Sequence, residues 1–212
     1  MQTRTLTPQE HQRVTAAIQA AESRTSGEII CVLARRSDSY FLASAFVVAV
    51  AMLAVSAIAA FVLERMWFSV PPWQFVLAQI LSLTASLALL WAAPGLRIRL
   101  VPRHLRYRRA HHNAVKQFLA RNIHVTERRT GVLIFLSLEE RYAEVIADAA
   151  INAHVPQQKW DAIVGDLVAH AARGEVANGF EAAIASCGRL LAEAFPLDGS
   201  DANELDDHLV EI

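Results

Sequence analysis

The chain has 212 residues, with 20 Lys or Arg, 21 Asp or Glu and a formal net charge of -1. Its two cysteines, Cys31 and Cys187, have neither the spacing of a disulfide framework nor that of a metal site, which excludes small disulfide-rich and zinc-finger folds. We expect both to be reduced core residues. No cleavable signal peptide is expected, because the residues before Gly27 are polar and amphipathic.

The first 40 residues predict one helix and one strand. Thr7-Pro8-Gln9-Glu10 combines a capping hydroxyl, a proline at the first helical position and an acid three residues after the cap. The apolar stripe that follows is typical of a helix, and Gly27 is expected to end it. Glu28 to Ala34 is a short apolar run rich in β-branched residues, which predicts a buried strand. Residues 1–40 are thus the expected first part of a cytoplasmic domain.

Residues 41–93 predict a transmembrane helical hairpin. Residues 41–63 and 74–93 are apolar runs without charge, and at about 1.5 Å per residue each approaches or exceeds the roughly 30 Å of a bilayer core. Pro71-Pro72 lies between them and is expected to reverse the chain. The alternative is a pair of core helices in a soluble protein, which would need a larger protein around them.

The arginines on either side of the hairpin predict its orientation. Two precede the first run and six follow the second, whereas the connecting turn has only Arg65 beside Glu64. Because Lys and Arg are retained on the cytoplasmic side, both termini are expected in the cytoplasm. The expected location is the inner membrane of a bacterium, crossed by two spans.

The rest of the chain predicts helices and two further strands. Residues 94–196 are expected to complete the domain, beginning with a basic segment and a helix over Arg108 to Asn122. Gly131 to Ser137 is a continuous apolar run, typical of a central strand, and Tyr142 to Asp148 is expected to pair with it as an antiparallel hairpin. Two helices with clear apolar periodicity follow. Residues 197–212 form an acidic tail without periodicity.

This order of elements predicts the α/β class. We expect a small mixed β-sheet in an α/β/α sandwich, interrupted by the two-helix hairpin. The first strand, the Arg108 to Asn122 helix and the second strand form a predicted right-handed parallel crossover. The carboxyl end of the first strand would then be tied to the membrane.

Several motifs resemble the TPM-domain family. They are TSGEI at Thr25 to Ile29, TGVLIFLSLEERYAEVIADAAI at Thr130 to Ile151, the helix start at Trp160-Asp161, and FPLDGSDANEL at Phe195 to Leu205. The family includes photosystem II repair-type thylakoid proteins and many bacterial proteins. The resemblance implies an α/β/α sandwich, and a role as an acid phosphatase, a calcium-binding module or an accessory factor for membrane complexes. The hairpin falls where most members have soluble helix or loop.

Acidic residues at the strand ends are candidate metal ligands. Asp38 follows the first strand, Glu139 and Glu140 follow the second, and Asp148 closes the neighbouring strand. Carboxylate oxygens are the ligands that Ca²⁺ or Mg²⁺ prefers. The alternative is structural, with two glutamates in a solvated turn and an aspartate that caps the next turn, and we favour it for the two glutamates. His104, His111 and His112 have no carboxylate nearby in sequence, so a metal site there is not expected.

The basic segment after the second span is a candidate membrane-surface site. Its cations are Arg97, Arg99, Arg103, Arg106, Arg108 and Arg109. From residue 97 to 129 there are ten Lys or Arg and one acid, whereas residues 139–212 contain fifteen acids and four Lys or Arg. Attraction to anionic headgroups is worth about 1 kcal/mol per well-placed cation. No nucleic-acid recognition motif accompanies the run, so nucleic acid is not expected as a partner.

The sequence therefore favours a membrane-anchored TPM-type domain that acts as a binding or accessory module for a membrane protein complex. A partner in the membrane, or a second copy, is expected from the small and polar residues in the spans. The alternative is a metal-dependent phosphatase at the membrane surface. No recognised catalytic constellation is present in the sequence.

Overall fold

A computed structural model of the chain describes residues 6–66, 70–125, 129–197 and 208–212. Most of the acidic tail and the middle of the turn between the two apolar runs lie outside the described residues. The chain divides into two compact units, one formed by Met1–Ser37 with Tyr107–Ile212 and the other by Asp38–Arg106. Each unit is described by itself.

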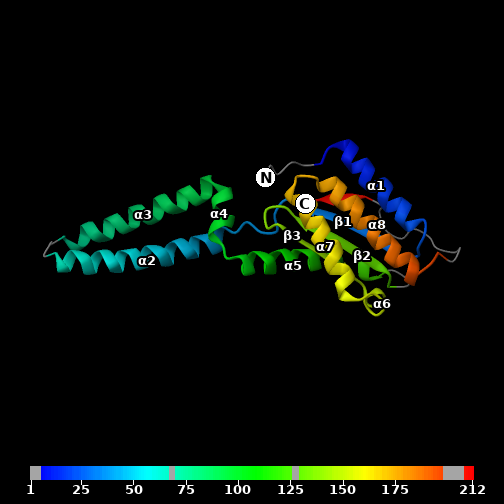
Figure 1. Cartoon of the computed structure of the whole chain (residues 1–212). Helices are drawn as coiled ribbons and strands as arrows, with labels where there is room; N and C mark the ends of the chain where they lie inside the picture. Colours follow the sequence, from blue (N-terminus) through cyan, green and yellow to red (C-terminus); the bar gives the residue numbers. More distant parts are fainter. Residues whose placement is uncertain (1–5, 67–69, 126–128, 198–207) are drawn as a thin grey trace. The chain divides into compact units, whose positions relative to one another are not determined.

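The first unit is built on a four-stranded mixed sheet (Figure 1). Its strands are β1 (Glu28–Ala34), β2 (Gly131–Ser137), β3 (Tyr142–Ala147) and β4 (Leu209–Glu211), in the order β3-β2-β1-β4. β1 pairs with β2 in parallel over all seven residues, and β2 pairs with β3 antiparallel. The predicted buried strand, central strand and hairpin are thus confirmed.

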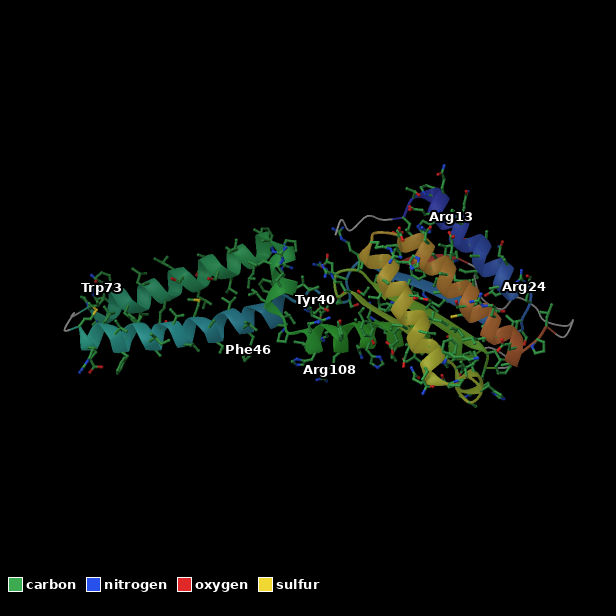
Figure 2. The ribbon with its side chains drawn as sticks, in the orientation of Figure 1. Arg13, Arg24, Tyr40, Phe46, Trp73 and Arg108 are labelled. Atoms are coloured by element: carbon green, nitrogen blue, oxygen red, sulfur yellow. The ribbon has the colours of Figure 1, made fainter. Side chains whose placement is uncertain are left out.

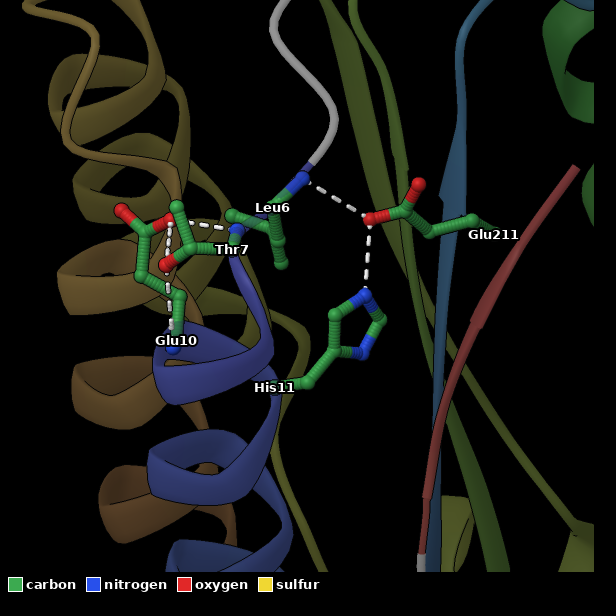
Figure 3. Close-up of polar contacts among 5 residues, drawn as sticks. All are labelled: Leu6, Thr7, Glu10, His11 and Glu211. Carbon is green, nitrogen blue, oxygen red and sulfur yellow. Dashed lines mark hydrogen bonds and ion pairs between the residues drawn. The ribbon is translucent and has the colours of Figure 1, made fainter.

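The edge strand β4 was not predicted. It pairs in parallel with β1 through Cys31, Val32 and Leu33, so the end of the tail belongs to the sheet. The Glu211 side chain of β4 contacts the residues at the start of the first helix (Figure 3). Its carboxylate accepts a hydrogen bond from the Leu6 amide at 3.0 Å and lies 2.9 Å from His11 Nε2.

Helices cover both faces of the sheet. The helices α1 (Pro8–Glu22), α7 (Gln157–Ala172) and α8 (Val176–Ala194) share one buried cluster with Cys31 and Ile134. The helix α5 (Arg103–Ala120) packs through Ala114 and Phe118 against Val32 and Phe135, which face the other way. Because successive strand residues point to opposite faces and both faces are covered, β1 and β2 are apolar except for Glu28 and Ser137 at their ends.

The sequence signals at the helix ends are mostly confirmed. Thr7 caps α1 as predicted, with the Glu10 side chain accepting from the Thr7 amide at 2.7 Å in a capping box (Figure 3). α1 ends at Glu22, several residues before Gly27. Gly174, just after α7, has φ +82, a conformation that glycine adopts without strain. Two short helical turns, η1 (Ile123–Val125) and α6 (Ala149–Asn152), complete this unit.

The second unit contains the two long apolar helices, α2 (Phe41–Arg65) and α3 (Pro72–Ala92), followed by the short α4 (Pro94–Leu100). Pro72 opens α3 at its first turn, where the missing amide hydrogen is tolerated. In the most apolar stretch of α2, 0% of the residues are buried, and in that of α3, 6% are buried. Phe46 and Trp73, which are labelled in Figure 2, lie on these helices. Their side chains are 72% and 64% exposed. The two helices are therefore not buried core helices in this structure.

The start of β2 leaves no room for a larger residue. A Cβ on Gly131 would lie 2.5 Å from both Cγ2 and the carbonyl oxygen of Ile123. We expect Gly131→Ala to lower the free energy of unfolding by about 1–3 kcal/mol, because the Ile123 backbone must move. Gly165→Ala in α7 is the matched control, since nothing lies within 4 Å of its Cβ and alanine favours a helix by about 1 kcal/mol. Denaturant unfolding of the detergent-solubilised chain measures both; equal stability of the two variants would contradict the close approach.

Candidate functional site

Glu140 is a buried carboxylate at the carboxyl ends of β1 and β2. It is 2% exposed, and its Oε1 accepts a hydrogen bond from the Ser37 amide at 2.9 Å. The Ser137 hydroxyl donates to Oε2, and the Ser37 hydroxyl lies 3.1 Å from the Ser137 hydroxyl. The expectation that both turn glutamates are solvated is therefore wrong for Glu140. Its carboxylate oxygens are used to hold the chain where it leaves β1.

Glu139 differs from its neighbour. Its backbone amide donates to the Arg35 carbonyl at 3.1 Å, which continues the pairing of β1 with β2 by one step. Its carboxylate lies 3.9 Å from Arg35 Nε, and the two side chains are 22% and 67% exposed. A pair of this length at the surface contributes little to stability.

Asp148 lies at the opposite end of the sheet from the two glutamates. β3 runs antiparallel to β2, so Asp148 returns to the start of β2 and its amide donates to the Gly131 carbonyl at 3.0 Å. Seven strand residues at about 3.3 Å each separate it from Glu140 by roughly 20 Å. Asp148 Oδ1 accepts from the Ala149 amide at 2.6 Å and caps α6. Its Oδ2 is buried and accepts no hydrogen bond within the described part of the chain.

Asp38 belongs to the second unit, where its role is local. Its Oδ1 lies 3.4 Å from both the Ser39 hydroxyl and the Tyr40 amide nitrogen, just before α2. Among the described residues, no three His, Cys, Asp or Glu side chains form a group able to hold a metal ion. Ca²⁺ takes six to eight oxygen ligands. Within the sheet-containing unit, Glu139 and Glu140 therefore do not share a calcium or magnesium site with Asp148.

The six candidate membrane-surface arginines are not equivalent. Arg97 is engaged within its own unit: Nε donates to the Leu90 carbonyl at 2.6 Å and Nη2 to the Trp91 carbonyl at 2.8 Å. Its guanidinium also lies 5.4 Å from the centre of the Phe41 ring. These contacts satisfy carbonyls at the end of α3, where a cation is favoured. Arg99, Arg103, Arg108 and Arg109 have exposed side chains, and Arg106 is half-buried.

The sequence analysis missed a polar cluster between α5 and β3. His111 Nδ1 lies 2.9 Å from the Glu144 carboxylate, which also accepts from the Tyr142 hydroxyl at 2.9 Å. The Tyr142 ring packs on Tyr107 with centroids 5.3 Å apart. Burial, and then the nearby Glu144 carboxylate, raise the pKa of Tyr142, so its hydroxyl remains a donor. The strand alternation that places Ala143, Val145 and Ala147 on one face places Glu144 on the other, which was the available signal.

The two cysteines are free and buried, as predicted. Burial raises the pKa of Cys187 to about 12, and burial is also the main cause that raises the pKa of Cys31. Since the thiolate is the reactive form, both thiols are expected to be inert in the folded protein.

Replacing Glu140 tests whether its role is structural. Glu140→Ala would leave the half-buried Ser37 amide and the buried Ser137 hydroxyl without this acceptor, so we expect a loss of about 2–3 kcal/mol in the free energy of unfolding. Glu139→Ala should change it by less than about 0.5 kcal/mol. Denaturant unfolding of the full chain provides the comparison. Similar effects of the two substitutions would show that Glu140 does not clamp the strand ends.

Comparisons with known proteins agree with this fold. The model of the TPM domain matches residues 79–190, which is more than half of the chain. The NMR structure of the BA42 protein from the psychrophilic bacterium Bizionia argentinensis is similar, with a TM-score of 0.61 and 18% sequence identity over 100% of this chain and 99% of that one. At this identity the likeness concerns the fold alone. Among curated proteins, none matches the chain. The matched family model establishes that the chain belongs to the TPM-domain family.

Proposed function

We propose that this chain is a membrane-anchored TPM-domain protein that serves as a binding or accessory module for a membrane protein complex. The observation that carries the proposal is the exposed apolar surface of α2 and α3. These helices have 25 and 21 residues with mean hydropathies of 2.8 and 1.9. At 1.5 Å per residue they are about 37 and 32 Å long, enough for a bilayer core of roughly 30 Å. Water is a poor solvent for such a surface, whereas lipid is a good one.

The proposed orientation places both termini in the cytoplasm of a bacterium, with two spans in the inner membrane. The arginines that follow α3 support it, because translocating several cations is unfavourable. Arg97 contributes to the anchor itself, since it holds the last carbonyls of α3. Arg99, Arg103, Arg108 and Arg109 remain exposed, and we propose that they contact anionic headgroups at about 1 kcal/mol each.

The charge distribution supports an accessory role. Fifteen of the 21 acids lie in residues 139–212, all in the sheet-containing unit. Anionic headgroups repel such a segment, which favours its use as a surface for a partner rather than for lipid. The partner that this chemistry fits is a basic segment of another protein at the cytoplasmic surface.

The orientation can be measured directly. We expect a reporter fused after Ile212 to be active in the cytoplasm and one inserted at Ser69 to be active in the periplasm. Arg99→Glu is a useful variant, because removal of one cation should leave the orientation unchanged while several remain. An external C-terminus would contradict the proposal.

The accessory role is tested by purification. A tagged form of the chain, solubilised in a mild detergent, should retain another membrane protein in a fixed ratio. Mass spectrometry would identify that protein. If the chain spans the membrane but purifies without any such partner, the proposed anchor stands and the proposed accessory role is wrong.

A metal-dependent phosphatase is the second candidate. One observation favours it: the buried Oδ2 of Asp148 has no hydrogen-bond donor among the described residues, and a cation would satisfy it. Since Asp148 belongs to no group of three His, Cys, Asp or Glu side chains within the described residues, we expect binding to be weak.

Calcium titration followed by thermal unfolding tests this site. We expect a small rise in Tm, seen only at millimolar Ca²⁺, because a ligand of the native state stabilises it by mass action. Asp148→Asn should abolish the rise and Glu139→Gln should not. A rise that survives in Asp148→Asn would show that the cation binds elsewhere, and no rise at millimolar Ca²⁺ would remove the site.

A further inference from the structure

A groove of about 350 Å³ runs between α2 and α3 within the second unit. It is lined by one stripe of α2, from Val48 to Ala59, and one stripe of α3, from Phe75 to Ser82, each at the spacing of one helix face. Ala51, Ala59 and Ala78 contribute small side chains to its walls. Small residues on a membrane helix permit another helix backbone to approach closely.

Three polar side chains, Ser56, Gln79 and Ser82, also line this groove. None of them makes a hydrogen bond to any residue that the structure describes. Two other hydroxyls of these helices, by contrast, are satisfied within their own helix: the Ser44 hydroxyl donates to the Phe41 carbonyl at 3.0 Å and the Thr84 hydroxyl to the Ile80 carbonyl at 2.8 Å. Three polar side chains without a hydrogen bond to the described residues therefore lie together on the walls of this groove.

Gln79 lies well inside the expected hydrocarbon layer. It is seven residues after Pro72, which places it about 10 Å along a helix of about 32 Å. A carboxamide has two donor hydrogens and one acceptor oxygen. Lipid chains offer none of the matching groups, so an unpaired amide at this depth is unfavourable.

We propose that the groove is a dimer interface, in which two copies of the chain meet through α2 and α3 and the two Gln79 carboxamides hydrogen-bond to each other. The inference rests on the proposed membrane spans. It goes beyond them by naming the surface, the partner and the residue that pairs.

The partner is a second copy because of depth and self-complementarity. Two copies inserted in the same orientation place Gln79 at the same depth, and a two-fold axis along the membrane normal brings the same surface of each together. A carboxamide both donates and accepts, so the same residue is a suitable partner. A different protein would have to present a polar group at that depth.

Disulfide cross-linking in liposomes of the purified chain tests the interface. Ala78→Cys places a thiol in the groove next to Gln79, and Leu81→Cys, at a position that is 62% exposed and outside the groove lining, is the matched control. The native Cys31 and Cys187 are buried and should not react. With a membrane-permeable oxidant we expect at least fivefold more dimer from Ala78→Cys, with the excess persisting as lipid is added. Equal cross-linking at the two positions would overturn the proposal.

Removal of the amide tests the role of Gln79. In the Ala78→Cys background, Gln79→Leu should weaken association roughly tenfold. Thr84→Val removes a hydroxyl that is satisfied within α3 and should have no effect. If Gln79→Leu dimerises as well as its parent, or if Ala78→Cys in native membranes cross-links to a different protein instead of its copy, the proposed pairing is wrong.

Alkaline carbonate extraction of the same membranes separates the two levels of inference. A chain that resists extraction but stays monomeric overturns the dimer and leaves the spans in place. A chain that is extracted overturns the spans, and the dimer with them.

Discussion

The parallel pairing of β1 with β2 is the constraint on which the rest of the structure depends. Seven residues of each strand are in register, from Glu28 beside Gly131 to Ala34 beside Ser137. Parallel strands cannot be joined by a tight turn, because the chain must return from the end of one strand to the start of the next. The connection can be long, since the entropic cost of closing a loop grows only with the logarithm of the number of residues in it. A separate unit, Asp38–Arg106, occupies this connection without interrupting the pairing.

The end of that pairing is where the two units are joined along the chain. The ladder continues past β1 and β2, with the Leu138 amide donating to the Ala34 carbonyl at 3.0 Å. Glu140 then accepts from the Ser37 amide, and Ser37 is the last residue before the second unit begins. A carboxylate suits this position because backbone and hydroxyl donors both point into a buried space, where an unsatisfied donor is unfavourable. Glu140, a candidate metal ligand in the sequence, thus binds backbone and hydroxyl donors at the end of the β1–β2 pairing.

Elements with a long repeated pattern were predictable, and features that depend on a single backbone conformation were not. Two examples are the continuous apolar runs of β1 and β2 and the apolar helical stripes of α7 and α8, each of which predicts its element directly. β4 has three residues, too few to show a period. The burial of Glu140 depends on a turn in which Arg141 has φ +53, a left-handed conformation that its residue type does not predict. Asp148 lies at the end of the sheet opposite to Glu139 and Glu140, because β3 returns antiparallel along β2. The His111 and Glu144 pair is 33 residues apart in sequence, and only the alternation of β3 could have indicated it.

Arg97 also bears on how the apolar helices present their groove. Through one guanidinium it binds the Leu90 and Trp91 carbonyls of α3 and covers the Phe41 ring at the start of α2. The separation of the two helices at this end is therefore set by side-chain contacts within the unit. Binding to a surface that already has its bound shape loses less conformational entropy than binding to one that must be ordered. The groove lies farther along the same two helices, and with polar side chains that lack a hydrogen bond on its walls it is better suited to receive another helix than to close on itself.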